Sequence, residues 1–212
     1  MVGAASLMAQ VSFKCCKKKI NTIQVISLTL LSVLVANAQF IMPERCPKPA
    51  VQEDFDAARY VGKWYDIQRL PNTFQKGECA TATYTLSPGV RFGALNRELL
   101  ADGTIISVIA SAIAEDPSEP AKLQIFYEND APVPYWVLST DYDNYALVYS
   151  CIELGAMHAA YASILSRQPT LPEETIKELH GTLSSFGVGV DKLLTTNQDV
   201  ASCSAMNQNR LR

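Results

Sequence analysis

Three tyrosines in the middle of the chain carry the chemistry that this sequence offers to a ligand. Tyr84, Tyr127 and Tyr135 each fall in a short, mostly apolar run. Alternate residues of a strand share a face, and on these faces stand small and aliphatic side chains: Ala80, Ala82, Leu123, Ile125 and Val137. A phenol group buries an apolar ring and presents one hydroxyl. The pattern predicts an apolar cavity with a few hydroxyl groups, and an ordinary core position is the alternative for each tyrosine.

Residue types that support catalysis or metal binding are scarce. His158 and His180 are the only histidines, and no two cysteines have C-x-x-C spacing, so we expect no metal site. His158 falls in a strand-like run, where it is either a structural residue or a ligand contact. Asp141 is accompanied by no histidine or nucleophile, so we expect no catalytic residue and no cofactor.

The first 38 residues have the composition of a secretory signal peptide. A lysine cluster at residues 14–19 precedes an apolar stretch from Ile20 to Val35, and Ala36-Asn37-Ala38 fits the small-x-small cleavage pattern. The alternative is a transmembrane anchor, but the stretch is short for a span and is interrupted by polar residues such as Asn21 and Gln24. We therefore expect a secreted, extracellular protein of residues 39–212.

The remaining 174 residues are enough for one domain with one core. The leader holds four lysines and no acidic residue, which leaves 14 Lys+Arg against 21 Asp+Glu. This acidic balance argues against nucleic acid or an anionic membrane as the main partner. Four cysteines also remain, Cys46, Cys79, Cys151 and Cys203. In an extracellular protein they predict two disulfides, and the spacing alone leaves three connectivities open.

The runs that must position the tyrosines follow one another at short spacing. Eight strands are predicted, at 60–70, 79–87, 90–99, 104–114, 121–128, 134–140, 144–152 and 156–166. Turn-like junctions such as Ser87-Pro88-Gly89 separate them, and such short connections favour antiparallel neighbours. We therefore expect an all-β, eight-stranded, up-and-down barrel over about 60–166.

The segment after the barrel breaks the alternation. Over 172–186, apolar residues recur at helical spacing, which predicts one α-helix packed outside the barrel. Val188-Gly189-Val190 is interpreted as a short additional strand, and the residues after Cys203 as a polar tail.

Two residues far apart in the chain suggest how the barrel closes. Gly62-Lys63-Trp64 begins the first strand, and Arg167 follows the last. A guanidinium group can stack on an indole and still donate hydrogen bonds. We expect Trp64 and Arg167 to meet at a closed end, with the opposite end open.

With these motifs the sequence resembles the lipocalin family, in the branch of apolipoprotein D, Lazarillo and the insect bilin-binding proteins. The resemblance rests on Tyr60-Val61-Gly62-Lys63-Trp64-Tyr65-Asp66-Ile67, on Thr140-Asp141-Tyr142 with the run to Cys151, and on Arg167. It covers roughly residues 46–203. It implies disulfides Cys46–Cys151 and Cys79–Cys203. It also implies a structural role for the motif residues, which are Gly62, Trp64, Thr140, Asp141, Tyr142 and Arg167.

The resemblance also implies a function: a secreted carrier of a small hydrophobic ligand, such as a lipid, sterol, retinoid or bilin. One alternative is a lipocalin-type isomerase, which uses a free thiol that an even cysteine count does not leave. Another is an interaction protein that works through its loops, as a protease inhibitor or as the ligand of a cell-surface receptor. The sequence does not set the oligomeric state.

Overall fold

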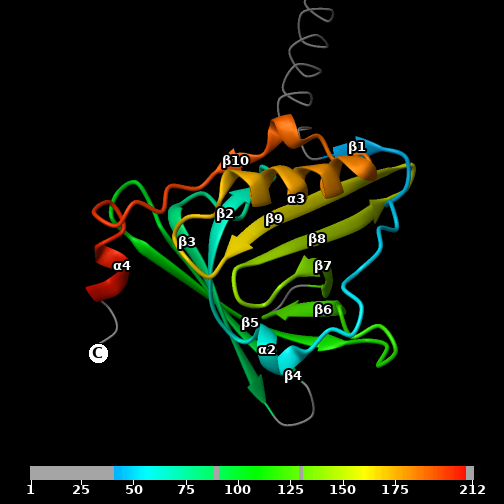
Figure 1. Ribbon diagram of the computed structural model, residues 1–212, viewed down its shortest axis with the longest axis horizontal. Coiled ribbons are helices and arrows are strands. Elements are labelled where there is room, and N and C mark those ends of the chain that lie inside the picture. The colour runs from blue at the N-terminus through cyan, green and yellow to red at the C-terminus, as the bar shows by residue number, and fades with distance from the viewer. Residues whose placement is uncertain (1–40, 88–90, 129–130, 209–212) are drawn as a thin grey trace, which may run out of the picture. The chain divides into compact units, whose positions relative to one another are not determined.

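The structure, a computed structural model, describes residues 41–87, 91–128 and 131–208, so the predicted signal peptide lies outside the described residues. Eight antiparallel strands form a closed barrel (Figure 1). They are β2 Gly62–Arg69, β3 Glu78–Ser87, β4 Arg91–Leu99, β5 Ile105–Ala114, β6 Lys122–Tyr127, β7 Val133–Thr140, β8 Tyr145–Leu154 and β9 Met157–Ser166. Each pairs with the next along the chain, and β9 pairs with β2 to close the barrel. The predicted fold class is confirmed.

Shorter elements extend or cover the barrel. Their bounds are β1 Ile41–Pro43, α2 Ala57–Tyr60, α3 Glu173–Ser185, η1 Val190–Lys192, β10 Leu194–Thr195 and α4 Ala205–Gln208. The strand predicted at Val188–Val190 is wrong: a 3₁₀ turn begins at Val190, and the added strand is β10, which pairs with Arg69 and Gln68. The predicted outer helix is confirmed within one residue at each end. Part of the tail after Cys203 is helical, as α4.

Strand alternation separates the two larger hydrophobic clusters of the core. The inner faces of the strands, with Trp64, Ile125 and Val137, form the first cluster inside the barrel. The second cluster lies outside, where α3 covers β8 and β9 (Figure 1). There Leu179 and Leu183, two members of the predicted helical stripe, are buried. Burying an apolar stripe in this way stabilises a helix of 13 residues that would be marginal alone.

Two disulfides tie the ends of the chain to the barrel. Cys46–Cys151 joins the segment after β1 to β8, and Cys79–Cys203 joins β3 to the C-terminal segment. They link residues 105 and 124 positions apart. Closing loops of this length stabilises a fold by roughly 2–5 kcal/mol per bond.

The closed end is built around Trp64. The Arg167 guanidinium carbon lies 3.6 Å from the centroid of the fully buried indole. Its nitrogens donate to the carbonyl oxygens of Tyr142 at 2.9 Å, Lys63 at 3.0 Å and Arg59 at 3.1 Å. Arg167 therefore joins the start of β2, the turn after β7 and the end of β9 in one cap.

Gly62 and the β7–β8 turn complete this end. Gly62 has a φ of 98°, and a Cβ there would lie 3.3 Å from Nη1 of Arg167, so the close approach favours glycine. In the turn, Asp141 accepts from the amides of Asn144 at 2.8 Å and Tyr145 at 2.9 Å. Thr140 Oγ1 donates to the carbonyl oxygen of Tyr145 at 2.6 Å. These contacts are structural in kind.

Candidate functional site

The inside of the barrel is lined by small, aliphatic and aromatic side chains. Four alanines, at 94, 110, 112 and 82, lie on the inner faces of β3, β4 and β5. Ala94 and Ala110 stand directly opposite each other across β4 and β5. Alanine fills little space, so this part of the inner wall is built from small side chains, whereas β6 and β7 contribute larger ones.

The exposure of inner-face residues locates the mouth of the barrel. Along β5, Ala112 and Ala110 are 3% and 5% exposed, whereas Val108 and Ile106 are 41% and 36% exposed. All four share one face, since their positions differ by two. The interior is therefore closed near Ala112 and reached by solvent at the end where Ile106 lies.

Three tyrosine hydroxyls meet in the closed half of the barrel. Tyr135 Oη lies 3.0 Å from Tyr60 Oη and 2.8 Å from Tyr84 Oη. The rings of Tyr60 and Tyr84 are 5.4 Å apart, and Trp64 packs beside Tyr60 with ring centroids 5.2 Å apart. We call Tyr60, Tyr84 and Tyr135 the tyrosine cluster.

Burial keeps the tyrosine cluster protonated. Removal from water raises the pKa of Tyr60 and of Tyr135 well above the usual value, and it also raises the pKa of Tyr84. The hydroxyls are therefore neutral at physiological pH. Two of the three O–H groups suffice for the two contacts within the cluster, so one proton remains for a ligand.

The sequence-predicted ligand residues are all on the inner face. Tyr84 and Tyr135 belong to the tyrosine cluster, and Tyr127 packs against the inner core nearer the mouth. Tyr60 was missed, because the prediction placed it at the start of a strand. It ends helix α2, whose N-cap Asp56 accepts from the amides of Ala58 and Arg59. That Asp-x-Ala-Arg pattern is the signal that could have indicated a helical turn.

His158 does not reach the interior. It lies on the outer face of β9, where Nδ1 is 3.0 Å from the carbonyl oxygen of Glu44. The sequence left His158 as either a structural residue or a ligand contact, and this contact agrees with the structural role.

A buried carboxylate lies beside the loop at the mouth, between β2 and β3. Asp66 Oδ2 accepts from Gln75 of this loop at 3.0 Å, and Oδ1 accepts from Thr196 at 3.3 Å. Glu98 accepts from the loop amides of Lys76 at 3.1 Å and Gly77 at 2.9 Å. Side chains of the barrel wall thus hold the loop in place at the open end.

Comparison with known proteins identifies the family. The protein-family model described as the lipocalin-like domain matches residues 55–198 of this chain. The chain belongs to the lipocalin family. Its predicted function, a carrier of a small hydrophobic ligand, is supported by this membership.

The relatives agree with the predicted branch. Apolipoprotein D of Mus musculus is 45% identical over 161 residues, which cover 75% of this chain and 84% of the relative. The Lazarillo protein of Schistocerca americana is 31% identical over 84% of this chain and 85% of its own. Among solved structures, insecticyanin from the tobacco hornworm Manduca sexta has a TM-score of 0.69 at 26% identity, over 78% of this chain and 92% of that one.

In this lipocalin, the stability should depend on pH through Asp66. Burial raises the pKa of Asp66 from 3.8 to about 6, while Arg69, Gln75 and Thr196 oppose the rise and Glu78 adds to it. The folded protein therefore binds more protons than the unfolded chain between pH 4 and 6, and its stability falls as pH rises through that window. In urea unfolding, the free energy of unfolding of Asp66→Asn should rise by about 2 kcal/mol relative to that of the wild type as the pH is raised from 4 to 7.

The exposed Asp54 supplies the control for this prediction. Asp54→Asn should track the wild type at every pH. If Asp66→Asn does so too, the carboxyl group is not titrating in the folded protein as described.

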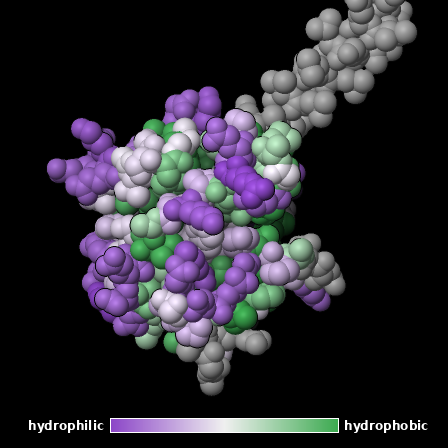
Figure 2. Space-filling view, turned by 90° about the vertical axis from the view of Figure 1, so that its right-hand side faces the viewer, coloured by the Kyte–Doolittle hydropathy of each residue, from purple (hydrophilic) through white to green (hydrophobic). Residues whose placement is uncertain are grey.

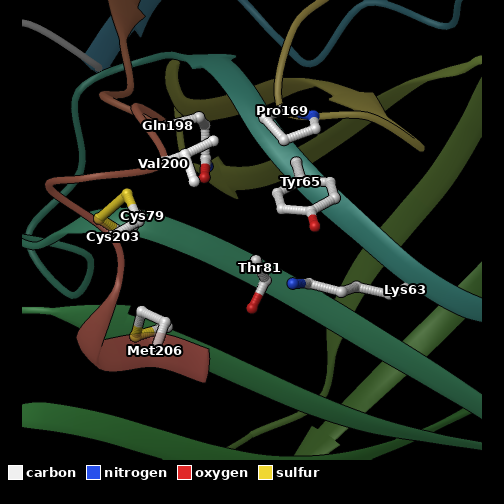
Figure 3. Close-up of a pocket in the computed structure, with 9 residues that line it drawn as sticks. All are labelled: Lys63, Tyr65, Cys79, Thr81, Pro169, Gln198, Val200, Cys203 and Met206. Carbon is white, nitrogen blue, oxygen red and sulfur yellow. A yellow bond between two sulfur atoms is a disulfide. The ribbon is translucent and has the colours of Figure 1, made fainter. Parts of the chain in front are cut away.

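Two pockets lie outside the barrel. One, shown in Figure 3, lies between the outer faces of β2 and β3 and the C-terminal segment, beside the disulfide Cys79–Cys203. Lys63 extends towards Thr81 in this pocket, and the Nζ atom of Lys63 lies 4.1 Å from the ring centroid of Tyr65.

The face of the molecule shown in Figure 2 mixes hydrophilic and hydrophobic residues. Within the described part of the chain there is no group of residues suited to a metal, and no helix long and apolar enough to cross a membrane.

Proposed function

We propose that this lipocalin is secreted and carries a small, uncharged apolar molecule whose polar end binds the tyrosine cluster. The observation that supports the proposal most directly is the position of three linked hydroxyls among apolar side chains in the closed half of the barrel. Burying apolar ligand area contributes about 25 cal/mol per Å², and the hydroxyls select the orientation. Fold membership alone would not name the ligand.

The tyrosine cluster favours a ligand that ends in a carbonyl or a hydroxyl group. One O–H proton is available to donate, and a carbonyl or hydroxyl oxygen can accept it. A charged end would lose its hydration without gaining an opposite charge in the tyrosine cluster. Among the ligand classes considered, retinoids and sterols with such an end fit best.

The alternative of an isomerase has no thiol to act through in the described residues. Cys46, Cys79, Cys151 and Cys203 are all in disulfides. We therefore favour a carrier without catalytic activity.

Retinol and the corresponding hydrocarbon that lacks its hydroxyl test the proposal. In fluorescence titrations the wild type should bind both and prefer retinol. Tyr135→Phe should weaken retinol binding about fivefold to tenfold, the loss of roughly one hydrogen bond, and leave the hydrocarbon unchanged. Tyr135 is chosen because it makes both contacts in the tyrosine cluster.

Tyr145→Phe is the matched control. Tyr145 is also a strand tyrosine, but its hydroxyl lies 3.2 Å from Ser139 Oγ, and its ring packs in the outer cluster. It should bind retinol as the wild type does. A wild type that binds neither compound, or equal losses for both compounds in Tyr135→Phe, would contradict the proposed site.

A further inference from the structure

The pocket between β2, β3 and the C-terminal segment lies on the outer wall of the barrel (Figure 3). Its volume is about 200 Å³, and it is open to solvent. The disulfide Cys79–Cys203 and the side chains of Pro169, Val200 and Met206 give it apolar walls. We call this space the outer pocket.

Strand register brings a cation and a hydroxyl together in the outer pocket. Tyr65 and Thr81 are direct partners across β2 and β3, and Lys63 lies two residues from Tyr65 on the same outer face. Direct and diagonal neighbours across two strands are close enough for long side chains to touch. The Nζ atom of Lys63 lies 4.1 Å from the ring centroid of Tyr65, and Figure 3 shows Nζ directed at Thr81. A ligand group placed between Lys63 and Thr81 therefore meets an ammonium group and a hydroxyl.

Neither donor is used within the described part of the chain. None of the ion pairs found there involves Lys63. The hydroxyl of Thr81 forms no side-chain hydrogen bond with another described residue. Lys63 is also the charged residue of the pocket lining, which includes no acidic side chain from the described residues. An ammonium group without a counter-charge, beside an unused hydroxyl, favours an anion.

A second cation stands on the other side of Thr81. Arg97 is the direct partner of Thr81 across β3 and β4, and its Nη1 donates to the carbonyl oxygen of Met206 at 3.3 Å. The ion pairs among the described residues do not include Arg97 either. The acidic side chains of Glu78 and Asp199 lie outside the lining and accept from backbone amides of the C-terminal segment. The guanidinium group thus adds positive charge beside the pocket and holds α4 against it.

We propose that the outer pocket binds a small monocarboxylate with an apolar body, such as an aromatic carboxylic acid. One carboxylate oxygen accepts from Nζ of Lys63, and the other accepts from the hydroxyl of Thr81. Hydrogen bonds of this kind are strengthened by the charges. The apolar body lies against the walls formed by Val200, Met206 and the disulfide.

The size of the outer pocket limits the ligand. An apolar cavity of about 150 Å³ holds benzene, and drug-sized ligands occupy roughly 300 Å³ or more. A volume of about 200 Å³ therefore suits one ring with a carboxylate group.

The outer pocket is separate from the carrier site. Lys63 and Thr81 point outward from β2 and β3, whereas the neighbouring Trp64 and Ala82 belong to the cluster inside the barrel. The inference does not rest on the proposed function, so either site can fail its test while the other passes.

Titration of the purified protein with benzoate, followed by two-dimensional amide NMR, tests the inference. Shifts should centre on Thr81, Gln198 and Val200 and should saturate with a dissociation constant on the order of 1 mM. Benzamide has nearly the same shape but no charge, and acetate has the charge but no ring. Each should bind the wild type about tenfold more weakly than benzoate, or worse.

Two variants remove the proposed donors one at a time. Lys63→Met keeps an unbranched side chain but loses the charge, and Thr81→Val keeps the shape but loses the hydroxyl. Lys63→Met should weaken benzoate binding about tenfold or more, and Thr81→Val about fivefold to tenfold. The matched controls are Lys177→Met, at an exposed lysine of α3, and Thr83→Val, at an outward-facing threonine of β3 that does not line the pocket. Both controls should bind benzoate as the wild type does.

Several results would each overturn the inference. Unchanged benzoate affinity in Lys63→Met or in Thr81→Val would remove the proposed donor. Equal affinities for benzoate and benzamide would show that the pocket does not recognise charge, and equal affinities for benzoate and acetate would show that it offers no apolar wall. Shifts centred on the inward-facing Ala94 and Ala110 would place benzoate inside the barrel. Shifts that do not saturate in the millimolar range would show that the pocket holds solvent only.

Discussion

Trp64→Ala is expected to lower the free energy of unfolding by about 3–5 kcal/mol, the usual loss for truncation of a large buried aromatic residue. The indole is fully buried, packs against Tyr60 and donates from Nε1 to the carbonyl oxygen of Tyr60 at 2.9 Å. Its removal leaves that oxygen without this donor and opens a cavity under Arg167. Urea unfolding followed by circular dichroism measures the loss.

The second tryptophan of the chain provides the control. Trp136 lies on the outer face of β7 and is only partly buried, so Trp136→Ala should cost less. Arg167→Lys should also destabilise the closed end, because a lysine cannot donate to three separated carbonyl oxygens in the geometry of a guanidinium group. A Trp64→Ala protein as stable as the wild type, with altered retinol preference, would show that the two ends of the barrel had been assigned the wrong way round.

The barrel was predictable because its strands obey local rules. Alternation in β6 and β7 placed Leu123, Ile125 and Tyr127 inward and Trp136 outward, and the structure has them so. The short connections between the strands indicated that sequential strands are antiparallel neighbours. Such signals are contained in neighbouring residues, so a single sequence suffices to find them.

The parts that the sequence did not predict depend on contacts between distant residues. β1 and β10 have too few residues to show alternation, and they are strands only because β9 and β2 offer them free edges. Tyr60 joins the tyrosine cluster because α2 turns it inward under the barrel. No local pattern indicates that Asp66 is buried, because its partners Gln75 and Thr196 come from a loop and from the C-terminal segment.

The interior wall also corrects one detail of the cavity predicted from β3. Ala82 does face inward, but it stands directly opposite Trp64, so a large side chain there would collide with the closed end. Ala110 is the better position for a bulky substitution, because it pairs with Ala94 on one side and with Tyr127 on the other. Substitution at Ala110 therefore tests occupation of the cavity with less disturbance of the cap.

Ala110→Trp should abolish retinol binding, with a loss of at least about 100-fold, because an indole would fill the space between the alanine wall and the tyrosine cluster. The neighbouring Ile109 supplies a matched control: it is 77% exposed on the outer face, since one step along a strand reverses the side. Ile109→Trp should bind retinol normally. Both variants should keep the circular dichroism spectrum of the wild type. Unimpaired retinol binding in a folded Ala110→Trp protein would place the ligand somewhere other than the barrel interior, and loss of binding in Ile109→Trp instead would place it on the outer wall of β5.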